Sequence, residues 1–172
     1  VRIDQLVKAM ATAFDYVESE LLGASTNHGK RIATLCSKMG RTLGMNDTQI
    51  SRLVTCALFH DNALTEYILS ERAGAEQQKN LYLHCEYGQR NIESLSFHSD
   101  VDGYVLYHHE RADGKGPFRK KEGEYPLGAE LIAIADMLDV AHHLQRLDKS
   151  ELPKLHREIE RDTGTIYTHR AA

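Results

Sequence analysis

Apolar residues recur at intervals of three and four positions along most of the chain, and this spacing limits the fold more than any other feature. The stripe from Ile3 to Leu21 is one example, and the run from Ile32 to Leu43 is another. Such spacing places the apolar side chains on one face of an α-helix. Because no segment alternates apolar and polar residues as a half-buried strand does, the sequence predicts an all-α bundle of about seven helices. We expect these helices at about residues 2–22, from 25–27 to 43, 46–58, 76–96, 100–110, 129–147 and 150–164.

Local signals mark where some of these helices begin and where the chain leaves helical structure. Asn46 followed by Gln49 has the pattern of a capping box, which satisfies backbone amides at a helix N-terminus. Pro153 is compatible with the first turn of the last helix, because the amide that proline lacks has no partner there. Residues 111–127 are rich in glycine and proline, so they predict a loop between two helices.

The bulk properties are those of one ordinary soluble domain, residues 1–172. The formal net charge is -4, with 41% hydrophobic and 27% charged residues, and this balance gives no reason to expect a nucleic acid polymer as partner. No apolar run approaches the length of a bilayer span, so we expect a cytoplasmic protein without membrane contact. Because the chain starts at Val1 within a helical pattern, we expect it to be cut from a longer protein. Formation of a homodimer is an open alternative.

The three cysteines, Cys36, Cys56 and Cys85, are widely spaced and lie within apolar patterns. An odd number with this spacing argues against a disulfide framework and against a cysteine-based zinc site. The sequence therefore predicts reduced thiols in the core.

A carboxylate at Asp136 interrupts the most apolar segment of the chain, "LIAIADMLDV". A buried carboxylate needs a cation or strong hydrogen-bond donors. A metal ion would meet this need, whereas a position at a helix edge facing water would remove it.

Histidine residues supply further metal-binding groups. His60 and Asp61 are adjacent at the predicted end of a helix, where two neighbouring side chains can converge on one ion. Such a dipeptide is weak evidence alone, but its weight grows because similar groups occur one or two to a helix, as in helical bundles that hold metals between helices. The candidate metal ligands are His28, His60, Asp61, His84, His108, His109 and Asp136.

The types and number of these donors indicate the kind of centre. Imidazole and carboxylate groups without thiolate suit iron, manganese or zinc. Five histidines and two aspartates exceed the needs of one ion and are enough for two. Two ions bridged by a carboxylate are typical of enzymes that hydrolyse phosphate esters.

Several motifs resemble the HD-GYP branch of the HD superfamily of metal-dependent phosphohydrolases. "NHGKRIATLCSKMGRTLGM" is similar to the segment around the first histidine of that family, and "HHERADGKG" is similar to its "HHExxDGxG". "ELIAIADMLDV" and "GTIYTH" match its later motifs. The resemblance covers essentially the whole chain and implies an HD-domain bundle with a metal centre between its helices.

The resemblance also implies ligands and a reaction. One ion would be held by His28, His60, Asp61 and Asp136, and the second by His84, His108 and His109, with Asp61 bridging. The expected cofactors are two divalent ions, iron or manganese first, with zinc, nickel or magnesium open. The family reaction is hydrolysis of cyclic di-GMP to pGpG or GMP by a metal-bridging hydroxide, with His60 and Asp61 as catalytic residues. In such proteins a sensor or other signalling domain in the full-length chain is the usual partner.

The chain departs from the family pattern around the substrate. Pro117 and Phe118 stand where the GYP motif has tyrosine and proline, and Leu64 replaces a lysine of the "HDxGK" motif. Ala24 replaces a glutamate associated with a third ion, so two ions are expected. Two alternatives therefore stay open: hydrolysis of another nucleotide, and a catalytically degenerate domain that signals by binding. The predicted substrate contacts are Arg31, Arg111, Asp113, Lys115, Arg146 and Lys149.

Overall fold

The computed structural model of the protein is helical, as the sequence predicts. It describes residues 3–22, 26–64, 82–95, 101 and 103–172, and within these residues it has six α-helices against about seven expected. None of the described helices is long and apolar enough to cross a lipid bilayer. The helices are α1 (Ile3–Leu22), α2 (His28–Thr42), α3 (Asp47–Leu58), α5 (Leu83–Ser94), α6 (Leu127–His142) and α7 (Leu152–Asp162), with short 3₁₀ helices η1 (Leu144–Arg146) and η2 (Lys149–Glu151).

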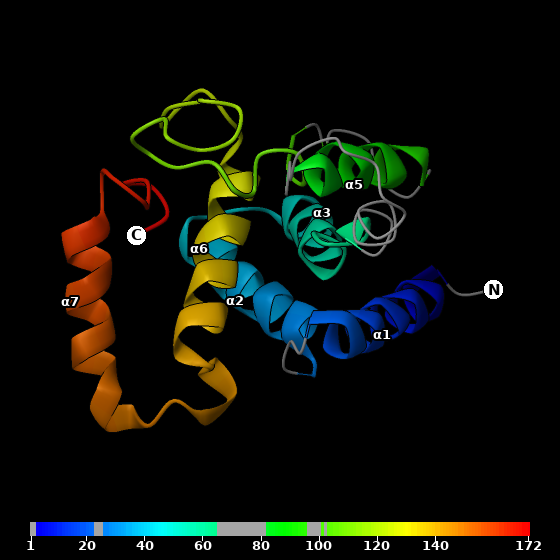
Figure 1. Ribbon diagram of the computed structural model, residues 1–172, viewed down its shortest axis with the longest axis horizontal. Coiled ribbons are helices and arrows are strands. Elements are labelled where there is room, and N and C mark those ends of the chain that lie inside the picture. The colour runs from blue at the N-terminus through cyan, green and yellow to red at the C-terminus, as the bar shows by residue number, and fades with distance from the viewer. Residues whose placement is uncertain (1–2, 23–25, 65–81, 96–100, 102) are drawn as a thin grey trace.

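Helix α2 lies at the centre of the fold and packs against α1, α3 and α6 (Figure 1). The main core forms where these helices meet, around Ile32, Leu53, Phe59 and Leu131, all essentially buried. A smaller cluster of Ile134, Leu138 and Leu155 joins α6 to α7. Because the apolar stripes of neighbouring helices face one another, the polar residues of the same faces are also brought inside.

The starts of α3 and α2 are capped in different ways. The capping box at α3 is confirmed, because the Asn46 side chain accepts from the Gln49 amide and the Gln49 side chain accepts from the Asn46 amide. Asn27 is the N-cap of α2 but adopts a left-handed conformation, with φ 63°, and makes no side-chain cap. Its backbone amide donates instead to Asp15 Oδ2 at 2.5 Å. This bond fixes the start of α2 against α1.

The predicted helix at residues 100–110 is wrong where the structure describes it. Residues 103–109 form consecutive turns, whereas Asp100, the predicted start of this helix, lies outside the described residues. The physical reason is a side chain of α5: Gln89 Oε1 accepts the backbone amides of Val105 and Leu106, each at 3.0 Å. These amides therefore do not form a helical ladder.

The ends of the last helices also differ from the prediction. Helix α6 ends at His142 rather than near residue 147, because His143 adopts a left-handed conformation with φ 46°. Helix α7 is preceded by the turn η2 and ends at Asp162. Pro153 does lie in its first turn, as predicted.

The predicted loop after the paired histidines is confirmed and is anchored at its base. Glu110 is buried, and its carboxylate accepts the amides of Phe118 and Lys120, both at 2.6 Å. The amides of Ala112 and Asp113 donate to carbonyls of Ile166 and Thr165. The loop therefore lies over one end of α6, close to the C-terminal segment (Figure 1).

Gly128 permits close contact between α6 and the turns that carry the paired histidines. A Cβ atom at this position would overlap the ring of Tyr104. Alanine should favour a helix by about 1 kcal/mol over glycine, but the overlap should cost about 1–3 kcal/mol. We therefore expect Gly128→Ala to lower the free energy of unfolding, measured by urea denaturation. In a Tyr104→Ala background the same substitution should become neutral or stabilising, and an equal loss in both backgrounds would contradict the steric explanation.

Candidate metal centre

All seven predicted ligands come together in one buried region. His28 begins α2, His60 and Asp61 follow the end of α3, His84 lies in the first turn of α5, and Asp136 lies in the middle of α6. His108 and His109 come from the turns that precede the glycine-rich loop. Of the seven, five are buried: His28, His60, His84, His108 and Asp136.

The first cluster consists of His28, His60 and Asp136, whose ligand atoms all lie within 4.8 Å of one another. His28 Nε2 is 3.2 Å from Asp136 Oδ1, and His60 Nε2 is 3.9 Å from the same oxygen. Three potential ligands from α2, α6 and the turn after α3 thus surround a common point.

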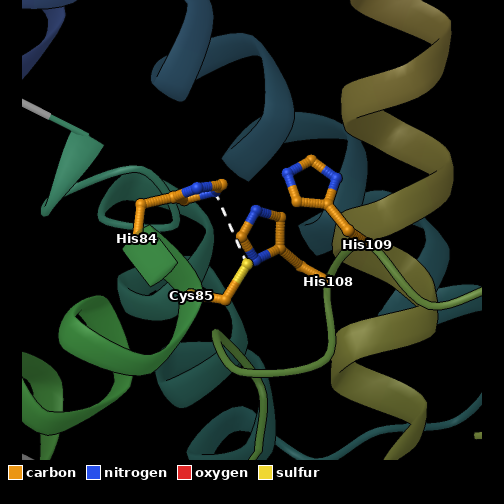
Figure 2. Close-up of side chains that lie close together, drawn as sticks. All are labelled: His84, Cys85, His108 and His109. Atoms are coloured by element: carbon orange, nitrogen blue, oxygen red, sulfur yellow. Dashed lines mark hydrogen bonds between the residues drawn. The ribbon is translucent and has the colours of Figure 1, made fainter. Parts of the chain in front are cut away.

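The second cluster consists of His84, Cys85, His108 and His109, and its ligand atoms also lie within 4.8 Å of one another. Figure 2 shows the side chains of His84 and Cys85, from the start of α5, meeting the paired histidines. The ring centroid of His84 lies 5.4 Å from that of His108 and 5.2 Å from that of His109. The two adjacent histidines therefore point to the same cluster.

Asp61 lies between the two clusters. Its Oδ2 atom is 3.4 Å from His60 Nε2, on the side of the first cluster. Its Oδ1 atom is 3.2 Å from His84 Nε2 and 3.5 Å from His108 Nε2, on the side of the second. One carboxylate thus presents a different oxygen to each group of ligands.

The polar atoms of this region fit a divalent metal. His60 Nε2, Asp61 Oδ1 and His108 Nε2 are buried and have no hydrogen-bond partner within the described residues. Leaving such atoms unpaired is unfavourable, and a cation would satisfy all three. The other ring nitrogens are already engaged: His60 Nδ1 is 3.0 Å from the Ala57 carbonyl and His108 Nδ1 is 2.5 Å from that of Val105. Because a carbonyl only accepts, Nδ1 is the donor and Nε2 keeps its lone pair for a ligand.

The two carboxylates and two of the five histidines have charge states that suit metal binding. Burial lowers the pKa of His60, and burial together with His108 lowers the pKa of His109 to about 3, so both rings are neutral. Burial opposes ionisation of Asp61 and Asp136, but the neighbouring histidines hold the pKa of each carboxyl below its usual range. Burial acts to lower the pKa of His84 and His108, but contacts with Asp61 and Cys85 raise it, to about 9 for His84. Because metals bind neutral imidazoles and ionised carboxylates, binding at these two rings would release their protons.

The prediction from the sequence did not include Asp139, which supports the first cluster. This buried carboxylate accepts from His28 Nδ1 at 2.7 Å and from Arg31 Nε and Nη2 at 2.7 and 2.8 Å. Burial acts to lower the pKa of His28, but Asp136 and Asp139 raise it to about 9. The signal in the sequence is the i, i+3 spacing of Asp139 from Asp136, which places both on one face of α6.

Two further residues of the region were missed. Glu18 of α1 is buried, and burial followed by repulsion from Asp61 raises its pKa to about 8. Its position four residues after Phe14 on the apolar stripe could have indicated this. Cys85 was assigned to the core, but it belongs to the second cluster. Burial acts to raise the pKa of its thiol, whereas contacts with His108 and His84 lower it.

The predicted substrate contacts fall into three places. Arg31 lies beside the first cluster, and its guanidinium binds Asp139 and the Thr26 carbonyl. Three residues of the loop form one group, in which Asp113 accepts from the Arg111 side chain and the Lys115 amide. Two residues, Arg146 and Lys149, are exposed on the turns after α6, at the opposite end of that helix from the loop (Figure 1). Their contacts with a substrate stay predictions.

A family model described as HD domain matches residues 16–159 of the chain. The chain therefore belongs to the HD-domain family. No curated protein matches it in sequence.

Two solved structures share the fold. A cyclic GMP-AMP-specific phosphodiesterase from V. cholerae has a TM-score of 0.73 and 18% identity, over 96% of this chain and 46% of that one. A protein from Bdellovibrio bacteriovorus described as HDG"Y"P has a TM-score of 0.61 and 17% identity, over 98% of this chain and 60% of that one. The chain thus spans about half the length of these proteins. At these identities the likeness shows the fold alone.

Asp139→Asn should weaken metal binding. The substitution keeps the side-chain size but replaces one oxygen with an amide donor, so His28 or Arg31 loses its charged acceptor. We expect the affinity of the metal-free protein for a divalent ion to fall by about 10- to 100-fold, measured by competition with a chromogenic chelator. Asp148→Asn changes an exposed carboxylate in the capping turn of η2 and is the matched control. Equal affinities of Asp139→Asn and wild type would contradict a positioning role.

Glu18→Gln should change the pH dependence of stability in the metal-free protein. The folded-state pKa of about 8 lies above the ordinary 4.5, so the folded protein binds the extra proton and wild-type stability falls as pH rises between these values. The variant lacks this loss. We expect similar unfolding free energies at about pH 4.5 and a more stable variant above about pH 8, measured by urea denaturation with chelator present. Glu20→Gln changes an exposed carboxylate on the same helix and is the control; a difference independent of pH would contradict the assignment.

Proposed function

We propose that this chain is a metal-dependent phosphodiesterase that hydrolyses a cyclic dinucleotide, with cyclic di-GMP as its first candidate substrate. The observation that carries the proposal is the position of Asp61, whose two oxygens face two separate groups of ligands. This arrangement supports a centre of two ions, with iron or manganese as the expected metals. In this centre His28, His60 and Asp136 would hold one ion, His84, His108 and His109 the other, and Asp61 both.

Two divalent ions, when bound, supply a nucleophile at neutral pH and stabilise charge on phosphoryl oxygens. The chain contributes by fixing its ligands before the substrate arrives. The carbonyls of Ala57 and Val105 hold the rings of His60 and His108, and Asp139 holds His28. Because each ring is oriented through its other nitrogen, little rearrangement is needed when a phosphodiester binds.

The loop after the paired histidines is suited to an anionic substrate. Residues 111–121 contain five basic residues and one acidic residue. The chain enters this loop directly after His109, and Glu110 holds it through the amides of Phe118 and Lys120. We propose that Arg111 and Lys115 of this loop face substrate phosphates, whereas Asp113 braces the loop by binding both.

Substrate choice is the part of the proposal that departs from the family pattern. Leu64 is buried and uncharged where the family motif has lysine, so this position supplies no cation to a phosphate. Phe118 stands where the GYP motif has proline and packs edge-to-face against Tyr107, with ring centroids 5.6 Å apart. The fold is shared with a cyclic GMP-AMP-specific enzyme, so cyclic GMP-AMP is the second candidate substrate.

The test is turnover by protein reconstituted anaerobically with Fe(II) or Mn(II). Cyclic di-GMP, cyclic GMP-AMP and a nucleotide monoester would be offered separately, and products separated by chromatography. We expect a cyclic dinucleotide to be linearised, and Asp61→Ala to lose more than about 100-fold in rate. His156→Ala, which alters an exposed histidine of α7, is the matched control and should keep full activity.

Each alternative has its own outcome. Turnover of the monoester alone would contradict a cyclic dinucleotide as substrate, and the protein would then be a hydrolase of nucleotide monoesters. If no substrate is turned over while two ions are bound, the proposed enzymatic activity is contradicted. That result would favour a domain that binds nucleotide and signals by contact with a partner.

A further inference from the structure

Cys85 differs from the other cysteines in its surroundings. Cys36 and Cys56 lie in the main apolar core, and the Cys36 thiol donates to the Leu131 carbonyl. Cys85 is equally inaccessible, with 0% of its surface exposed, but its neighbours are imidazoles. Figure 2 shows its sulfur directed at the His84 ring, 3.5 Å from Nε2.

The spacing of these atoms is that of ligands around one ion. Zinc lies about 2.3 Å from a cysteine sulfur and about 2.0–2.1 Å from a histidine nitrogen, so tetrahedral ligands place sulfur and nitrogen about 3.5 Å apart. The observed distance from Cys85 Sγ to His84 Nε2 is 3.5 Å. In the absence of a metal the two atoms form a hydrogen bond, and the same separation is compatible with both binding one ion.

A second observation at the same place points independently to a cation. His108 is 1% exposed, and its Nε2 atom has no hydrogen-bond partner within the described part of the chain. A ring nitrogen of His108 and Cys85 Sγ belong to one group of mutually close ligand atoms. Because Nδ1 of this ring is held by the Val105 carbonyl, Nε2 is the atom that faces the cluster.

We propose that Cys85 is a metal ligand, so that the ion held by His84, His108 and His109 also binds a thiolate. This inference rests on the proposed metal centre and adds a ligand to it. On binding, the thiol releases its proton to solvent and a sulfur–metal bond replaces the S–H bond.

A thiolate makes the two halves of the centre chemically different. The cluster of His28, His60 and Asp136 offers only nitrogen and oxygen, which manganese and iron accept. The cluster with Cys85 offers a softer donor, which favours iron, cobalt or zinc over manganese and magnesium. The second half should therefore discriminate more strongly among divalent metals than the first.

Cobalt provides a direct readout that does not depend on turnover. Metal-free protein would be titrated anaerobically with Co(II), with bound ions counted after gel filtration. We expect a near-ultraviolet sulfur-to-cobalt charge-transfer band in the wild-type protein. Cys85→Ser should abolish the band and weaken binding of one ion by at least about 10-fold. Cys56→Ser changes an equally buried thiol outside the cluster and should keep the band.

X-ray absorption of wild-type protein loaded with zinc makes the test independent of any variant. A sulfur neighbour at about 2.3 Å from the metal is expected. Two bound ions without a sulfur neighbour or a charge-transfer band would overturn the inference and leave the proposed two-ion centre standing. One bound ion with a sulfur neighbour would support the inference and contradict the two-ion centre. Absence of bound metal would overturn both.

Discussion

The arrangement of the helices around Asp61 depends on one electrostatic constraint. Its carboxylate lies among three imidazoles, and its Oδ1 atom is buried with no hydrogen-bond partner among the described residues. A buried charge of this kind is unfavourable unless cations or strong donors surround it. The ends of α3 and α5, the turns at 103–109 and the middle of α6 all direct polar groups to this point. The fold thus concentrates buried polar groups that a bound cation would satisfy.

The ligands are held by backbone groups that secondary structure leaves unused. The Ala57 carbonyl is among the last of α3, where carbonyls have no helical partner, and it accepts from His60. The Val105 carbonyl lies in a turn and accepts from His108. Helix ends and turns therefore orient metal ligands at no expense to helical hydrogen bonds. His60 and Asp61 also lie beyond the end of α3. Their side chains can therefore converge on one region although the two residues are adjacent in sequence.

The two halves of the centre are supported in different ways. On one side Asp139 links His28 to Arg31, so the guanidinium is part of the support for a ligand. On the other side the ligands adjoin a loop that Glu110 secures through two backbone amides. Changes of sequence in this loop would therefore alter the proposed substrate contacts while the predicted metal ligands keep their positions.

The sequence alone determined the all-α class, the capping box at Asn46 and the predicted metal ligands that gather in the fold. These features follow from periodicity and from residue types, which act locally or recur regularly. Only the tertiary structure decided the surroundings of Glu18, Cys85 and Asp139. Asp139 meets His28 across 111 positions of sequence, and Gln89 of α5 turns a predicted helix into turns by accepting two of its amides. Such contacts depend on how helices pack, because a side chain's partner is set by distance in space and not by spacing along the chain.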